Sequence, residues 1–331
     1  MSERAEPRHG PKASAVHRFA LFTAAATFAL IFVGGLVTST GSALAVPDWP
    51  LSFGGLFPRM TGGVLYEHGH RMVAGLVTIL TLMLTVWIVR REPRYGVRLM
   101  AVSALCLILV QALLGGLTVL FKLPLAIAVA HAACAQAFFC LMVALCVVTN
   151  PHWTEGEARV VDRASLPLAS LAALTTAVIY TQILAGALMR HMGAGLVIPD
   201  FPLSFGRLVP PRFPAPVAVN FAHRVGALLV IVLVAWTVAR VARFYRHQLR
   251  LYRIALALGA LLAVQISLGA LTVWSGRAVI PTTAHVAIGA ALLAVSLTLA
   301  VRAHHLTRAH TASSAALDRA EMETAQGRAG A

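Results

Sequence analysis

The sequence predicts an all-α integral membrane protein with eight transmembrane helices, arranged as two parallel-repeat four-helix bundles about a pseudo-twofold axis along the membrane normal. Three observations lead to this prediction. Of the 331 residues, 59% are hydrophobic and only 12% are charged, against about 25% charged residues in soluble domains. The apolar residues form long uncharged runs, and the chain contains an internal duplication. These features exclude an ordinary soluble enzyme, a disordered chain and a coiled coil.

Eight apolar runs are each long enough to cross a bilayer as a helix. Each run has about 20 residues or more, and at about 1.5 Å per residue this length matches the hydrocarbon core. The runs are nearly continuous, whereas barrel strands alternate in polarity. We expect spans at residues 19–40, 68–89, 99–120, 125–148, 166–189, 217–239, 254–274 and 281–301.

The distribution of basic residues predicts the orientation. Nineteen of the 27 Lys and Arg residues lie in the two tails and in the loops at 90–98, 149–165 and 240–253. The positive-inside rule therefore places both termini in the cytoplasm and segments 41–66 and 190–216 outside. The net charge of +15 does not indicate a nucleic-acid partner, because it lies in short loops rather than on one soluble face. A cleaved signal peptide is the alternative for the first run, which is longer than a signal core.

This topology divides the chain into five parts. We expect a cytoplasmic N-terminal tail at 1–18, an N-terminal bundle at 19–148, a cytoplasmic linker at 149–165, a C-terminal bundle at 166–302 and a disordered cytoplasmic tail at 303–331.

The duplication is clearest in the two long outer segments. Residues 41–58 read GSALAVPDWPLSFGGLFP and residues 193–210 read GAGLVIPDFPLSFGRLVP, with eleven of the eighteen positions identical. Four spans in each half return the chain to the same side, so the halves are parallel. Asp48 and Asp200 match, and we expect them to cap a turn. Two interpretations of the loops stay open: a lid over a pocket, or an anchor at the membrane interface.

Four histidines follow the repeat. His70 matches His223 on the second span of each half, and His131 matches His285 on the fourth. All four lie in the first residues of spans that enter from the outside, so they share one depth. Two histidines on two helices of a bundle can face each other across its interior.

This arrangement favours two heme sites. Neutral imidazole is a good ligand for heme iron, which accepts one on each face. Zinc is the alternative metal, but it requires three or four ligands in one site. The other alternative is that each histidine only packs between helices. The four cysteines lie inside apolar runs and form no CxxCH motif, so we expect neither covalently attached heme nor a disulfide framework.

Charged residues accompany the second-span histidines. Arg71 and Arg224 directly follow them, and we expect each arginine to bind a heme propionate, with snorkelling to the interface as the alternative. Glu67 stands one helical turn before His70, whereas Asn220 occupies the matching place in the second half. This difference predicts unequal halves, with Glu67 moving protons or stabilising positive charge near the first heme. The alternative is a helix-end acid.

Together these motifs resemble the heme A synthases of bacteria and mitochondria. The resemblance covers roughly residues 17–302 and rests on GSALAVPDWP, Glu67-His-Gly-His70-Arg71, His131 in AVAH, His223-Arg224 and His285. It implies that heme O is oxidised at a ring methyl to the formyl group of heme A by successive hydroxylations, for cytochrome oxidase biogenesis. It further implies that His70 and His131 ligate the substrate heme.

The second-half pair, His223 and His285, would then ligate a heme b cofactor, and Glu67 would be catalytic. The implied partners are heme O, its synthase and the lipid bilayer of a bacterial cytoplasmic membrane. The electron donor is not identified, and a homo-oligomer is left open.

The chain departs from this family in two ways. Many members carry a cysteine pair in the first outer loop, and segments 41–66 and 190–216 have none. Thr38 stands where many members have an arginine, whereas Arg190 keeps that charge in the second half. The rival functions are a non-enzymatic di-heme b-type cytochrome or heme carrier, and a transporter. Transporters usually break their helices near the midplane, whereas the repeat-matched histidines and the charged residues beside them lie at one outer face, which disfavours transport.

Overall fold

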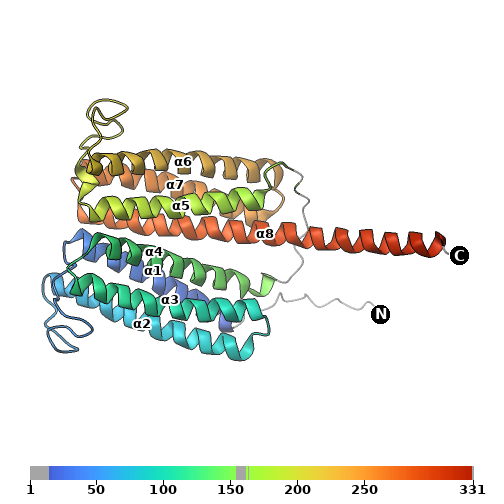
Figure 1. Ribbon diagram of the computed structural model, residues 1–331, viewed down its shortest axis with the longest axis horizontal. Helices are drawn as coiled ribbons and strands as arrows, with labels where there is room; N and C mark the ends of the chain where they lie inside the picture. The colour runs from blue at the N-terminus through green and yellow to red at the C-terminus, as the bar shows by residue number, and fades with distance from the viewer. Residues whose placement is uncertain (1–14, 154–161, 163, 330–331) are drawn as a thin grey trace, which may run out of the picture.

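The computed structural model describes residues 15–153, 162 and 164–329 (Figure 1). In these residues the chain is all helix and loop, with eight helices long and apolar enough to cross a membrane. They are α1 (Ala15–Ser39), α2 (Gly63–Arg91), α3 (Tyr95–Leu120), α4 (Leu125–Val148), α5 (Leu168–His191), α6 (Ala215–Phe244), α7 (Leu249–Trp274) and α8 (Val279–Ala329). Two short 3₁₀ helices, Pro151–Trp153 and Ala194–Leu196, lie in loops. The predicted all-α membrane class and the eight predicted spans are confirmed.

The ends of the helices follow from local sequence. Pro124, Pro167 and Pro214 directly precede α4, α5 and α6. Proline lacks an N–H group, and a helix leaves its first N–H groups without an internal partner, so little is lost there. The last turn of α2 contains Arg90 and Arg91, and cations are favoured at the negative end of the helix dipole.

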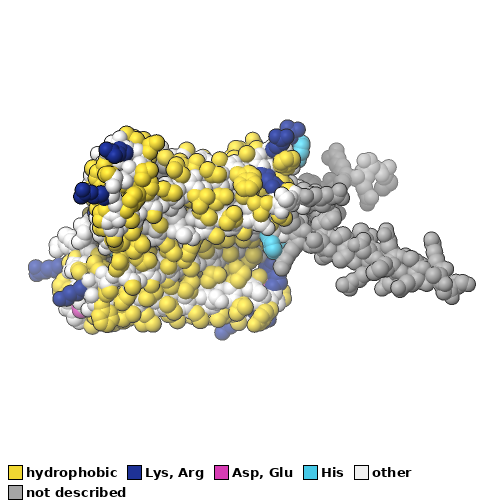
Figure 2. Space-filling view, turned by 45° about the horizontal axis from the view of Figure 1, so that its top comes forward, with side chains coloured by type: hydrophobic (Ala, Val, Ile, Leu, Met, Phe, Trp, Pro, Cys, Tyr) yellow, Lys and Arg dark blue, Asp and Glu magenta, His cyan; other side chains and the backbone are white. Residues whose placement is uncertain are grey.

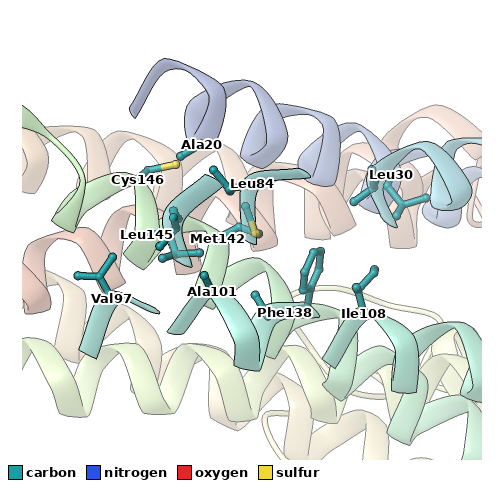
Figure 3. Close-up of a cluster of buried hydrophobic side chains, with 13 residues drawn as sticks. Ala20, Leu30, Leu84, Val97, Ala101, Ile108, Phe138, Met142, Leu145 and Cys146 are labelled. Atoms are coloured by element: carbon teal, nitrogen blue, oxygen red, sulfur yellow. The ribbon is translucent and has the colours of Figure 1, made fainter. Parts of the chain in front are cut away.

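The helices pack as two groups of four (Figure 1). In the first group α1 packs against α2 and α4, and α3 packs against the same two helices; in the second group α5 and α7 pack in the same way against α6 and α8. The groups meet where α1 and α4 contact α8 and where α4 contacts α5. Buried side chains from the first four helices form one apolar core, in which Phe138 and Met142 lie near Leu84 (Figure 3). The pseudo-twofold axis stays a prediction.

The flanks of the molecule are apolar, as a membrane protein requires. Large side chains such as Ile79, Leu82 and Val232 expose about half of their surface on the outside of the helices. Figure 2 shows hydrophobic side chains covering the flanks, with Lys and Arg gathered at the two ends. An apolar exterior of this extent is stable only in lipid. The chain is therefore a multi-pass membrane protein.

Helix α8 is longer than a span. It continues to Ala329, so residues 303–329, where we expected a disordered tail, are a continuation of α8. The sequence there is rich in alanine, the strongest helix former. Residues 1–14 of the predicted N-terminal tail, and residues 154–161 and 163 of the linker, lie outside the described part of the chain.

The two long loops, 40–62 and 192–214, project from the same end of the two groups (Figure 1). In the first loop Asp48 accepts hydrogen bonds from the N–H groups of Phe53 and Gly54, both at 2.8 Å. In the second, Asp200 accepts the same pair from Phe205 and Gly206, at 2.8 and 2.7 Å. The predicted turn caps are therefore confirmed.

These hydrogen bonds also affect acidity. The N–H groups of Gly54 and Phe53 stabilise the carboxylate and hold the pKa of Asp48 below its usual value. The N–H groups of Gly206 and Phe205 do the same for the pKa of Asp200.

Candidate functional site

The four repeat-matched histidines occupy the even-numbered helices α2, α4, α6 and α8. Each lies in the second or third turn of its helix, at the end from which the long loops project. All four are partly buried. His70 and His131 are close enough to interact electrostatically, and so are His223 and His285. The structure therefore brings the histidines together as the two pairs that the repeat predicts.

Each imidazole packs against a glycine on the preceding helix. A Cβ atom added to Gly34 would stand 3.0 Å from Cε1 of His70, and one added to Gly186 would stand 2.9 Å from Cε1 of His223. The matching distances are 3.2 Å from Gly115 to His131 and 3.1 Å from Gly269 to His285. The absence of a side chain at these four positions gives each ring its place against the neighbouring helix.

The second-helix histidines differ in their hydrogen bonds. Nδ1 of His223 lies 3.0 Å from Nε2 of Gln182, which also donates to the backbone carbonyl of His223 at 2.6 Å. Nδ1 of His70 is buried and has no hydrogen-bond partner among the described residues. The repeat places Leu30 where the second half has Gln182. A second difference between the halves lies next to Gln182. The amide oxygen of Gln182 lies against Gly226, which has no side chain, and the repeat places Val73 at the matching position of the first half.

The fourth-helix histidines resemble each other more closely. Nε2 of His131 lies 3.3 Å from the Gln111 amide, and Nε2 of His285 lies 3.4 Å from the Gln265 amide. Nδ1 of His285 also lies 3.2 Å from the carbonyl oxygen of Gln265.

This set of donors fits a heme better than a zinc ion. The described residues contain no group of three or more His, Cys, Asp or Glu side chains placed to bind a metal ion. Two imidazoles from facing helices match the two axial positions of heme iron. The buried Nδ1 atoms of His70 and His131 have no hydrogen-bond partner among the described residues, which leaves them available to a group bound in the bundle interior.

Arg71 holds the first long loop. Its Nη1 donates to the carbonyl oxygens of Asp48 at 2.7 Å and Leu51 at 2.9 Å. Its Nη2 donates to Oε1 of Glu67 at 2.7 Å. The other carboxylate oxygen of Glu67 accepts the N–H group of Val46 at 2.8 Å. Glu67 is thus a buried residue, 4% exposed, that forms an ion pair with Arg71 on its own helix and ties α2 to the loop through its hydrogen bond with Val46.

Arg224 holds the second long loop in the same way. Its Nη1 donates to the carbonyl oxygens of Asp200 and Leu203, both at 2.8 Å. Its Nε donates to Oδ1 of Asn220 at 2.9 Å, and Nδ2 of Asn220 donates to the Ala194 carbonyl at 2.8 Å. Asn220 therefore replaces Glu67 without a charge. The propionate role of Arg71 and Arg224 stays a prediction, since their contacts in the structure are with the loops.

Sequence reasoning missed several of these residues. The four glycines carried a signal, because Gly34 repeats as Gly186 at an offset of 152 and Gly115 repeats as Gly269 at an offset of 154, next to the histidine offsets of 153 and 154. Gln182 carried none, since it has no counterpart in the first half.

Comparison with known proteins assigns the chain to a family. Residues 67–297 match the COX15-CtaA family model, described as cytochrome oxidase assembly protein. The heme A synthase of Symbiobacterium thermophilum is 31% identical over 273 residues, covering 78% of this chain and 85% of that protein. The heme A synthase of Shouchella clausii is 31% identical over 232 residues, covering 67% and 75%. That of Bacillus pumilus is 29% identical over 282 residues, covering 80% and 88%.

These matches confirm the resemblance that the sequence motifs indicated. The match covers α3 to α7 completely, α2 from residue 67 onward and α8 as far as residue 297. It includes all four histidines, Glu67 and both arginines that follow His70 and His223. The chain belongs to the COX15-CtaA family of cytochrome oxidase assembly proteins.

Proposed function

We propose that this protein is a heme A synthase, an oxidoreductase of the membrane that converts a ring methyl of heme O to the formyl group of heme A. The observation that carries the proposal is the pairing of His70 with His131 and of His223 with His285, in a chain related to heme A synthases. When heme is bound, its iron supplies the redox chemistry. The protein supplies ligands, orientation and protons.

The two sites have different tasks in this proposal. The second-half pair, His223 and His285, holds a resident heme b, and the first-half pair, His70 and His131, receives heme O. Two differences support this division. The second half has Gln182 to orient the ring of His223, as befits a cofactor that stays bound. The first half alone has a carboxylate, Glu67, one helical turn from its histidine.

Glu67 is the proposed proton carrier at the first site. Each of its oxygens accepts one hydrogen bond in the structure, from Val46 or from Arg71. A carboxylate oxygen has two lone pairs, so each keeps one for a further donor. Glu67 could therefore hold or transfer a proton without leaving its place in the loop contact.

The proposed orientation places both termini in the cytoplasm and both heme sites toward the outer face of a bacterial cytoplasmic membrane. The distribution of basic residues supports this orientation. The halves are then related by a pseudo-twofold axis along the membrane normal, which the matching loop and histidine contacts support. Heme O arrives from its synthase, a further partner in the proposal.

The test separates an enzyme from a non-enzymatic di-heme cytochrome. His223→Ala and His285→Ala should each abolish the resident low-spin spectrum of heme b. Glu67→Gln should leave heme content nearly unchanged while heme O or a hydroxylated intermediate accumulates, because an amide cannot accept and release the proton. Asn220→Asp is the matched control, and it should not create a second active site. Normal heme A formation by the Glu67→Gln protein would show that Glu67 only holds the loop.

A further inference from the structure

Arg190, near the end of α5, lies between the two groups of helices. Its Nη2 reaches α1, where it donates to Oγ of Ser39 at 2.9 Å and to the carbonyl oxygen of Gly35 at 3.4 Å. The hydroxyl of Thr283 on α8 donates to the same Ser39 at 3.0 Å. Nε of Arg190 is buried and has no hydrogen-bond partner among the described residues. A guanidinium of five donors is thus only partly satisfied.

No negative charge in the described part of the chain balances this arginine. The ion pairs there join Arg71 to Glu67, Arg94 to Glu92 and Arg240 to Asp162. Asp48 and Asp200, the other acids at the loop end, accept hydrogen bonds from their own turns. The ionisable neighbours of Arg190 are instead Arg277 and the imidazole of His191. A buried guanidinium beside a second one, that of Arg277, is unfavourable unless an anion joins them.

Arg190 and His191 each lie near one of the two histidine pairs. The charge of Arg190 acts on His285 of the second pair, and His191 acts on His131 of the first. The arginines that follow the second-helix histidines are occupied elsewhere, since Arg71 and Arg224 donate to the loops. Among Arg71, Arg190 and Arg224, Arg190 is therefore the one with a buried N–H group, at Nε, that has no partner among the described residues.

We propose that Arg190 binds a carboxylate, a propionate of the heme held by His223 and His285, with Arg277 adding positive charge beside it. The proposal rests on the proposed function for the presence of that heme. A guanidinium binds a carboxylate through charge-assisted hydrogen bonds, and the free Nε–H is one such donor. The first half lacks a matching arginine, because Thr38 stands at that position. The hydroxyl of Thr38 donates to the carbonyl oxygen of Gly34 on its own helix at 3.0 Å.

The experiment compares protoheme with its dimethyl ester, which has the same ring but no carboxylate. The full-length protein, produced in heme-depleted cells and purified in detergent, is titrated with each pigment. The wild type should bind protoheme at least about tenfold more tightly than the ester, since a charge-assisted hydrogen bond is lost. Arg190→Gln should bring this ratio close to one by weakening protoheme binding, and Arg190→Lys should restore part of it. Arg212→Gln, at an exposed position in the second loop, is the control and should keep the wild-type ratio.

A second measurement separates carboxylate binding from a structural role. The Arg190→Gln protein loaded with the ester should show the same bis-histidine low-spin spectrum as the wild type loaded with the ester. If Arg190→Gln weakens the binding of both pigments equally, Arg190 only joins α5 to α1. If Arg190→Gln leaves the ratio of protoheme affinity to ester affinity unchanged, Arg190 contacts no propionate. Either result overturns the proposal. A wild-type protein that binds neither pigment would refute the proposed function itself.

Discussion

Gly186→Ala should displace the ring of His223 and weaken heme binding in the second half. The added Cβ would stand 2.9 Å from Cε1 of His223, whereas ordinary contacts begin at 3.4 Å, so the ring or the helix must move by at least 0.5 Å. Overpacking of this kind costs about 1–3 kcal/mol. If the whole cost weakens heme binding, heme affinity decreases by about 5- to 150-fold.

The assay is heme content per protein after purification, together with a titration of the low-spin absorbance. Gly259→Ala is the control in the same half, because its Cβ would meet only Val238, at an ordinary 3.8 Å. Gly34→Ala, at 3.0 Å from His70, should leave the resident heme in place and reduce the conversion of heme O. A Gly186→Ala protein with wild-type heme content and affinity would refute the reasoning that these glycines seat the ligands.

Three further predictions concern the ring orientation, the outer turns and the topology. Gln182→Leu places at this position the residue type that the first half has, and it should speed the loss of heme from the His223 site to an acceptor protein and shift the midpoint potential of that heme. Gln182→Glu should retain the heme. Equal rates of heme loss in the wild type and both variants would contradict this. The carboxylate of Asp48 has a lowered pKa, so its stabilisation of the turn is complete above the unfolded pKa of about 4 and is lost as the pH falls through the folded value. The protection factors of the Phe53 and Gly54 amides, which correct hydrogen exchange for its intrinsic dependence on pH, should therefore fall below about pH 4 but not between pH 7 and 5, and Asp48→Asn should lower them at pH 7. Reporter fusions after residues 95 and 245 should lie in the cytoplasm and fusions near 55 and 205 outside; an external signal at 245 would invalidate the orientation.

The parts of this structure that sequence predicted well depend on strong local signals. Long apolar runs defined the eight spans to within a few residues, because a bilayer admits few other backbone structures. The duplication indicated the caps at Asp48 and Asp200, since a short-range turn needs only a few neighbouring residues. Repetition also selected the four histidines among thirteen.

The parts that sequence could not give depend on contacts between distant segments. Arg71 and Arg224 hold the loops by binding backbone carbonyl groups that lie about twenty residues earlier in the chain. The sequence alone does not show that the loop folds back to these arginines. Gln182 became noticeable only through its contact with His223, 41 residues later. The helix from 303 to 329 was missed because a polar composition was given more weight than the helix propensity of alanine.

The central claim is that this chain makes heme A. The direct measurement uses cells that produce heme O but lack their own heme A synthase, into which the full chain is introduced. Pigments extracted from their membranes are separated and identified by mass. The account predicts heme A in cells with the wild-type chain and its absence in cells with the His70→Ala chain. A wild-type chain that is present in the membrane with its bis-histidine heme, while only heme O accumulates, would contradict the account and favour a non-enzymatic cytochrome.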